Sequence, residues 1–190
     1  TPGFRSIEDI TTLSKVDREA LAQVSWQAFA DVLILESKKG DTYKALITLH
    51  DGKKIETVLM QNARGHWTVC VSSQVGCAMA CTFCATGTMG FTRNLTVDEI
   101  VDQYRVWMMY LEDHPELTGQ ITNIVFMGMG EPLANYQNVK QTIETILRYT
   151  EIGPTRITVS TVGLIPMLHK LLDDDTWPPV RLAVSLHSAD

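Results

Sequence analysis

The chain has 190 residues, of which 45% are hydrophobic and 20% are charged, ordinary proportions for a globular protein with a core of its own. Sixteen basic and 22 acidic side chains give a net charge of −6 at pH 7, which excludes a protein that is basic over its whole surface. No run of about 18 apolar residues is present, and the polar first residues lack the apolar core of a signal peptide. We therefore expect a cytoplasmic protein that does not associate with a membrane.

Residues 1–30 are expected to form helices. A short helical piece is expected over 7–13. A longer helix is expected over 17–30, because apolar residues recur there at mixed helical spacing, at Leu21, Val24, Trp26 and Phe29.

Residues 31–67 predict a β-hairpin module. The pair Asp51-Gly52 is a strong hairpin turn signal, because both residues tolerate positive φ. The strands of the module are expected at 31–36, 43–49 and 54–60.

From Thr68 onward the pattern changes to alternating strands and helices. Four short apolar segments predict strands, at 68–72, 121–127, 156–161 and 180–186. One helix is expected to begin with the capping box Thr96-Val97-Asp98-Glu99, a second with Asn135 as its cap, and a third covers 164–172. This alternation predicts parallel β/α units with right-handed crossovers.

A segment with functional residue types lies at or just after the carboxyl end of each of these strands. The segments are the loop that carries Cys77, Cys81 and Cys84 (the cysteine loop), the turn Gly128-Met-Gly-Glu-Pro132, Ser160-Thr161 and Ser185-Leu-His187. The carboxyl ends of parallel strands lie at one rim of the sheet, so we expect the four segments to share a site. The flexible side chains of Met127 and Met129 are expected to serve packing.

The four cysteines all lie between positions 70 and 84. A disulfide framework would tie distant segments together, so this clustering indicates a metal site in a reducing compartment. Cys77, Cys81 and Cys84 have the spacing C-x3-C-x2-C, and three thiolates can bind three irons of a cubane cluster while the fourth iron stays open to substrate. The alternative is a zinc knuckle with Cys70 or His66 as the fourth ligand, although zinc sites usually pair their ligands in two separated knuckles.

The cysteine spacing, with an aromatic residue before the third cysteine, resembles the signature of radical S-adenosylmethionine (SAM) enzymes. Longer motifs resemble the RlmN/Cfr family of ribosomal RNA adenine methyltransferases: Cys70-Val-Ser-Ser-Gln-Val-Gly-Cys77, Gly90-Phe-Thr-Arg-Asn-Leu-Thr96, Met127-Gly-Met-Gly-Glu-Pro132 and Ser185-Leu-His187. The segment 158–163 is also similar, with Val162 where a serine is expected. The resemblance implies an α/β fold, a partial radical-SAM (β/α) barrel with parallel strands. Residues 1–30 would end a helical domain, 31–67 would lead into the barrel and 68–190 would form the radical SAM core.

The resemblance also implies a role for each matching residue. It assigns a 4Fe–4S cluster to Cys77, Cys81 and Cys84. Gly130 and Glu131 would meet the methionine end of SAM, Ser160 would contact the cofactor, and Ser185, Leu186 and His187 would line its adenosine end. Cys70 matches the cysteine that helps to resolve a covalent protein–RNA intermediate, and Glu56 matches the family's proton acceptor.

The reaction implied by the resemblance is the methylation of adenine C2 in large-subunit ribosomal RNA and, in some members, in tRNA. An electron donor such as a flavodoxin-type reductant would reduce the cluster, and the reduced cluster would cleave SAM to give a 5′-deoxyadenosyl radical. The cofactor would therefore carry out the radical chemistry. The family carries the methyl group on a further cysteine, but no cysteine follows Cys84. We therefore expect a monomeric fragment that is inactive alone as a methyltransferase. The alternatives are an adenine C8 methyltransferase and a non-catalytic, zinc-stabilised RNA-binding module.

Two pairs of lysines, Lys38-Lys39 and Lys53-Lys54, are expected at the same end of the β-hairpin module. They would either contact RNA phosphates or form a solvated edge that discourages pairing with other strands. The interspersed Asp41 and Asp51 favour the solvated edge.

Overall fold

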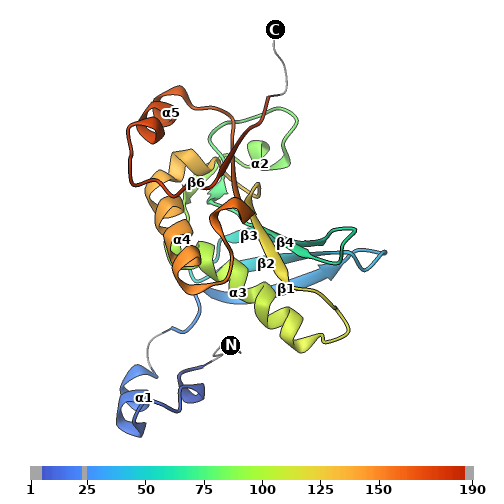
Figure 1. The fold of residues 1–190 in the computed structure, drawn as a ribbon, viewed down its shortest axis with the longest axis vertical. Helices are drawn as coiled ribbons and strands as arrows, with labels where there is room; N and C mark the ends of the chain where they lie inside the picture. Colours follow the sequence, from blue (N-terminus) through green and yellow to red (C-terminus); the bar gives the residue numbers. More distant parts are fainter. Residues whose placement is uncertain (1–5, 23–24, 187–190) are drawn as a thin grey trace.

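The computed structural model describes residues 6–22 and 25–186. Its strands are β1 (Phe29–Glu36), β2 (Thr42–Leu49), β3 (Lys54–Gln61), β4 (Trp67–Cys70), β5 (Gln74–Gly76), β6 (Phe91–Asn94), β7 (Ile121–Phe126), β8 (Ile157–Thr161) and β9 (Arg181–Val184). Seven of them form one sheet in the order β1-β2-β3-β4-β7-β8-β9, and β5 and β6 form a separate pair (Figure 1). β1 to β4 are antiparallel, whereas β4, β7, β8 and β9 are parallel. The hairpin strands therefore extend the same sheet as the parallel strands.

Helices connect the parallel strands. Their bounds are α1 (Lys15–Leu21), α2 (Ala85–Thr88), α3 (Val97–Asp113), α4 (Tyr136–Tyr149) and α5 (Ile165–Leu172), with 3₁₀ turns η1 (Ile7–Asp9), η2 (Pro132–Asn135) and η3 (Pro154–Arg156). α3 precedes β7, α4 joins β7 to β8 and α5 joins β8 to β9, as parallel neighbours require. This arrangement confirms the predicted α/β fold with parallel strands. None of the helices in the described part of the chain combines the length and the apolar character needed to cross a membrane.

The long helix expected over 17–30 is wrong in its second half. α1 ends at Leu21, and Phe29 already belongs to β1, where it pairs with Leu49 of β2. Backbone pairing with a neighbouring strand overrides a weak helical pattern, because tertiary contacts stabilise a segment more than its intrinsic helix propensity does. Val24, which contributed to that pattern, lies outside the described residues.

The two predicted helix starts differ in their capping. Thr96 and Glu99 form the capping box as expected: the Glu99 N–H donates to Thr96 Oγ1 at 3.3 Å, and the Thr96 N–H donates to Glu99 Oε2 at 2.9 Å. Asn135 is the residue before α4, but its side chain does not cap the helix. Its amide instead donates to the buried carbonyls of Ser73 and Leu95, both at 2.8 Å, because buried carbonyls need a donor.

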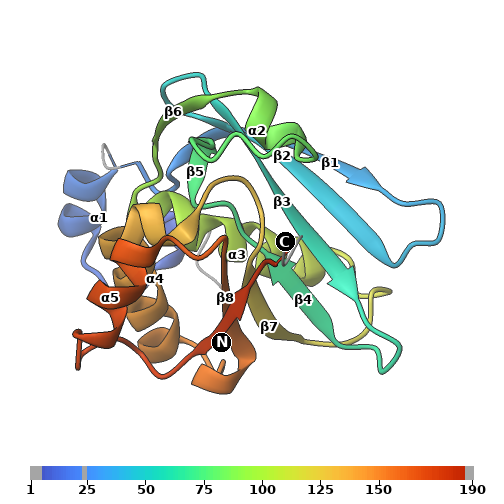
Figure 2. The same ribbon diagram turned by 90° about the horizontal axis from the view of Figure 1, so that it is seen from above.

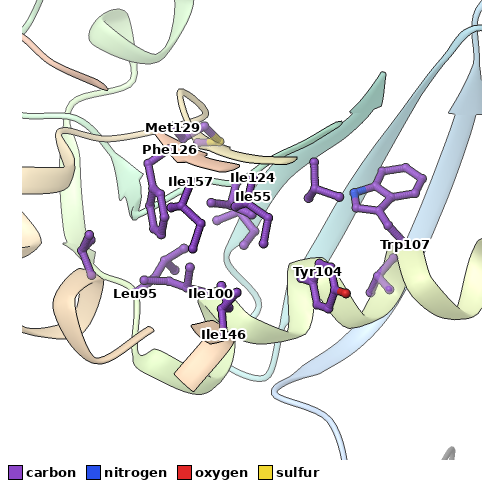
Figure 3. Packing of buried hydrophobic residues seen from close by; sticks show 14 of the residues in the cluster. Ile55, Leu95, Ile100, Tyr104, Trp107, Ile124, Phe126, Met129, Ile146 and Ile157 are labelled. Atoms are coloured by element: carbon purple, nitrogen blue, oxygen red, sulfur yellow. The ribbon is translucent and has the colours of Figure 1, made fainter. Parts of the chain in front are cut away.

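One face of the sheet is covered by helices and holds the core. Figure 3 shows Ile100, Tyr104 and Trp107 of α3 directed towards the strands. The indole N–H of Trp107 donates to Thr57 Oγ1 of β3 at 3.0 Å, so the ring is fixed by a hydrogen bond as well as by packing.

The opposite face of the sheet carries the candidate catalytic residues. Val58 is paired with Cys70 across β3 and β4, and Cys70 is paired with Val125 of β7. Directly paired residues point to the same face, and so do residues two positions apart on one strand. Glu56 and Cys70 therefore share this face, which we call the open face.

The two lysine pairs do not lie at one end of the module, so that expectation is wrong. Lys38 and Lys39 lie in the turn between β1 and β2, and Lys53 lies in the turn between β2 and β3. Consecutive turns of an antiparallel meander lie at opposite ends of its strands.

Candidate functional site

A cavity of about 290 Å³ lies at the carboxyl ends of β7 and β8. Its walls come from the cysteine loop, the turn after β7, the end of β8 with the residue that follows it, and the residue after β9. In Figure 1, α2 of the cysteine loop and the end of β9 lie at the same, upper end of the molecule. The lining residues are Cys77, Met79, Cys81, Phe83, Cys84, Thr86, Phe126, Met127, Gly128, Gly130, Glu131, Ser160, Thr161, Val162 and Ser185. The four segments that the sequence placed at one rim therefore meet.

Most of the residues predicted for cofactor binding line this cavity. Ser160 and Ser185 approach each other directly: their hydroxyl oxygens lie 2.9 Å apart and join the ends of β8 and β9. Leu186 is not among the lining residues and is 74% exposed. His187 lies outside the described residues. Met127, expected to serve packing, is half exposed and lines the cavity.

The cysteine loop is held at its base by β5 and β6. Gln74 is paired with Asn94, and the Cys77 N–H donates to the Gly90 carbonyl at 2.9 Å. Within the loop, a Cβ at Gly87 would lie 2.7 Å from the Cys81 carbonyl oxygen, so only glycine allows this close turn. The loop therefore has a defined shape with its cysteines on the cavity wall.

The three loop thiols fit a cluster better than a single ion. All are free thiols that line the cavity. Within residues 6–22 and 25–186, however, no three His, Cys, Asp or Glu side chains are grouped closely enough to hold one metal ion. A cubane cluster does not require such convergence, because each thiolate binds a different iron. Burial raises the pKa of the Cys77 thiol; a hydrogen bond with the Met79 backbone lowers it, and the nearby Cys81 and Glu131 raise it further. A bound iron would offset this, since coordinated thiols are deprotonated.

Glu131 links the turn after β7 to the segment after β8. The residue is 3% exposed, and its carboxylate accepts two backbone hydrogen bonds, from Leu133 at 3.0 Å and from Val162 at 2.9 Å. Each carboxylate oxygen has a further lone pair, so a ligand can still bind there. Position 162 holds valine where the family resemblance predicts serine. This difference leaves the hydrogen bond to Glu131 intact, because residue 162 donates it through its backbone N–H.

A group of buried polar residues, which the sequence did not point to, holds the Gly130 turn against the cysteine loop. Gln74 Oε1 accepts the Glu131 N–H at 2.9 Å, while Gln74 Nε2 donates to Asn94 Oδ1 at 2.8 Å. Ser72 Oγ accepts the Met129 N–H at 2.8 Å. The feature of the sequence that indicates this group is the run of three polar residues between the two valines of Val71-Ser-Ser-Gln-Val75.

Ser72 is itself fixed from the helix side. Gln103 of α3 accepts the Ser72 N–H at 2.7 Å and donates to the Ser72 carbonyl at 3.0 Å. Both residues are fully buried, so these bonds form away from competing water. The turn after β7 is therefore anchored through Ser72 to the core helix α3.

Arg93 ties the cysteine loop to the hairpin between β2 and β3. Its guanidinium contacts both oxygens of Glu99 at 2.8 Å, and its Nε contacts Asp51 Oδ2 at 2.8 Å. Bidentate pairing of this kind fixes orientation. Figure 2 shows β6 beside the hairpin end of β2 and β3. Arg93 is thus held by carboxylates of the chain itself.

The open face carries Glu56 and Cys70, which do not line the cavity. The Cys70 side chain is buried, and this burial raises its pKa from an ordinary 9.0 to about 11, although a hydrogen bond with the Met127 backbone lowers it slightly. The thiol is therefore protonated at neutral pH. Glu56 is half exposed and pairs with Lys44 at 3.1 Å.

We predict that Cys70 reacts slowly with iodoacetamide. Only the thiolate attacks, and a pKa two units above that of an ordinary thiol leaves about 100-fold less thiolate at pH 8. Peptide mapping after timed alkylation between pH 7 and 11 measures the rate at each cysteine. The rate at Cys70 should rise with pH throughout this range. Alkylation at pH 8 as fast as that of a free cysteine would contradict the buried position.

Comparisons with known proteins agree with this geometry. The sequence pattern of the radical SAM superfamily matches residues 71–190. The dual-specificity RNA methyltransferase RlmN of Desulfotalea psychrophila is 45% identical over 195 aligned positions, which cover 100% of this chain and 53% of the relative. A probable dual-specificity RNA methyltransferase RlmN of Chlorobium phaeobacteroides is 50% identical over 79% of this chain and 41% of its own.

A solved structure shows the same fold. The crystal structure of a radical SAM methyltransferase from Sphaerobacter thermophilus superposes with a TM-score of 0.86 at 40% identity, covering 97% of this chain and 53% of that chain. The chain thus spans about half the length of the relatives it matches. Members of this superfamily use a 4Fe–4S cluster and SAM, in keeping with the cysteines on the cavity wall. The chain belongs to the radical SAM superfamily, and the curated relatives described above are RlmN proteins.

Proposed function

We propose that these 190 residues are the cluster- and SAM-binding part of an RNA methyltransferase that acts on adenine C2 of large-subunit ribosomal RNA and on tRNA. The observation that carries the proposal is the meeting of the three loop cysteines with Gly130-Glu131, Ser160 and Ser185 around one cavity. The relatives' description as dual-specificity RNA methyltransferases supports two RNA substrates.

The residues of the cavity divide into two groups with different tasks. Cys77, Cys81 and Cys84 bind three irons of a 4Fe–4S cluster. The Gly130-Glu131 turn offers backbone and carboxylate acceptors to the ammonium group of SAM, and the paired hydroxyls of Ser160 and Ser185 offer donors and acceptors to its nucleoside end. When bound, the cluster and SAM supply the radical chemistry that an sp² carbon without an acidic proton requires.

The residues of the open face act on the RNA. Glu56 accepts the proton that the target carbon loses when the methyl group replaces it. Cys70 helps to release the RNA from its covalent adduct with the protein. The methyl-carrying cysteine belongs to the part of the relatives' length that these residues do not span. The enzyme works in the cytoplasm as a monomer, with a flavodoxin-type reductant as electron donor.

The test is a methylation assay with the full-length enzyme that contains these residues. Ribosomal RNA and tRNA transcripts are incubated anaerobically with SAM and a reductant, and digested nucleosides are identified by mass spectrometry. We expect 2-methyladenosine in both RNAs and none with the Cys77→Ala variant. Product that consists only of 8-methyladenosine, or binding of RNA without any methylation, would overturn the proposal.

A further inference from the structure

Lys44 contacts the proposed proton acceptor directly. Its ammonium nitrogen lies 3.1 Å from Glu56 Oε1. In the register of β2 and β3, Lys44 is paired with Val58 and Leu46 with Glu56, so the two charged residues are diagonal neighbours on one face of the sheet. A lysine side chain is long enough to span this diagonal.

The pair lies on the open face close to the turn that contributes to the cavity. Cys70 is paired with Val58 and therefore shares the face of Lys44 and Glu56. Ser72 Oγ donates to the Glu56 carbonyl at 2.5 Å and accepts the Met129 N–H at 2.8 Å. One side chain thus joins the backbone of Glu56 to the turn that carries Gly130.

Folding stability does not explain this ion pair. The two side chains are 44% and 46% exposed, and pairs with such exposure contribute between 0 and about 1 kcal/mol. Arg93, by contrast, joins three segments through two carboxylates. Lys44 joins only two strands that their backbone ladder already holds together.

We propose that Lys44 is a positioning residue, whose ammonium group holds the Glu56 carboxylate in one orientation on the open face. The proposal rests on the assignment of Glu56 as proton acceptor. A half-exposed glutamate otherwise samples several rotamers, whereas an acceptor must lie within hydrogen-bond reach of the proton that it takes. Lys44 binds Oε1, and Oε2 has no hydrogen-bond partner among the described residues, so this second oxygen is available for the proton.

The test compares four variants of the full-length enzyme, Lys44→Met, Lys44→Arg, Glu56→Gln and the double variant Lys44→Met/Glu56→Gln, with Lys53→Met as a fifth, control variant. For Lys44→Met we expect kcat for RNA methylation to fall about 10-fold with little change in KM for RNA, because misplacing a catalytic group slows the step that it serves. Lys44→Arg keeps a cation in reach and should recover kcat to within about 3-fold of the wild type. Lys53→Met removes an exposed cation from the adjacent turn and should leave kcat unchanged.

The double variant separates positioning from an independent role. If Lys44 acts through Glu56, the double variant should be no slower than Glu56→Gln alone. A further loss of kcat by about 10-fold in the double variant would overturn the proposal and show that Lys44 acts independently of Glu56. A raised KM with unchanged kcat in Lys44→Met would also overturn it and would assign Lys44 to RNA binding. Iron content and SAM cleavage without RNA should stay at wild-type values in all variants.

The same experiment distinguishes this proposal from the one on which it rests. Wild-type kcat in Glu56→Gln would remove the assignment of Glu56 and the role of Lys44 with it. Slow methylation by Glu56→Gln together with wild-type kcat in Lys44→Met would overturn only the role of Lys44.

Discussion

Replacing Cys77 by alanine is expected to abolish both the cluster and SAM cleavage. Iron content after anaerobic reconstitution should fall from about four to below one per chain. The loop supplies three thiolate ligands, and the cluster needs all three. Cys77 lines the cavity, and its backbone N–H is bonded to Gly90 at the base of the loop. The substitution removes a ligand without removing that backbone bond, so the fold should persist.

Cys70→Ala is the matched control for this result. Cys70 is also a free cysteine, but it lies on the open face and does not line the cavity. We expect this variant to keep about four irons per chain and to cleave SAM at the wild-type rate. Equal loss of iron in both variants would show that Cys70 is a ligand. It would contradict the assignment of the cluster to Cys77, Cys81 and Cys84 alone.

Gly130→Ala is expected to weaken SAM binding by about 100-fold, because a displacement of about 1 Å in a binding turn can cost that much. Gly130 has φ +97°, which side chains rarely adopt. A Cβ there would lie 2.5 Å from Gln74 Cβ and 2.8 Å from the Gln74 backbone nitrogen, so the turn must move away from the cysteine loop. We also expect the free energy of unfolding to fall by about 2–4 kcal/mol. Isothermal titration calorimetry of the reconstituted protein with SAM, together with urea denaturation, measures both effects.

Gly153→Ala supplies the control for Gly130→Ala. Gly153 has φ −77°, and no atom lies within 4 Å of a Cβ added there. This substitution should leave SAM affinity unchanged and alter the free energy of unfolding by less than about 1 kcal/mol. Wild-type SAM affinity in Gly130→Ala would mean that the turn after β7 does not hold the cofactor.

Local signals predicted most of the elements that frame the site. The Thr96 capping box and the Asp51-Gly52 turn each depend on neighbouring residues, and each is present in the structure. The helix expected over 17–30 failed because Phe29 pairs with Leu49, a contact between residues far apart in the chain. No local pattern encodes such a contact.

The same distinction applies to the site: short motifs predicted its residues, but they did not predict the hydrogen bonds between residues far apart in the chain. The loop cysteines, Gly130-Glu131, Ser160 and Ser185 could be named from motifs, and their meeting at one rim followed from parallel strands. The bond from Glu131 to Gln74 joins residues 57 positions apart. The Lys44–Glu56 pair depends on the register between β2 and β3, which the turn alone does not specify.

The most direct test of the central claim is the iron and sulfide content of the chain after anaerobic reconstitution, with SAM-cleavage products assayed in the same sample. The cavity formed by the loop cysteines, Glu131 and the two serines predicts about four irons and four sulfides per chain and the release of 5′-deoxyadenosine. A colourless protein that takes up one zinc ion and leaves SAM intact would contradict the account and would make the cysteine loop a structural metal site.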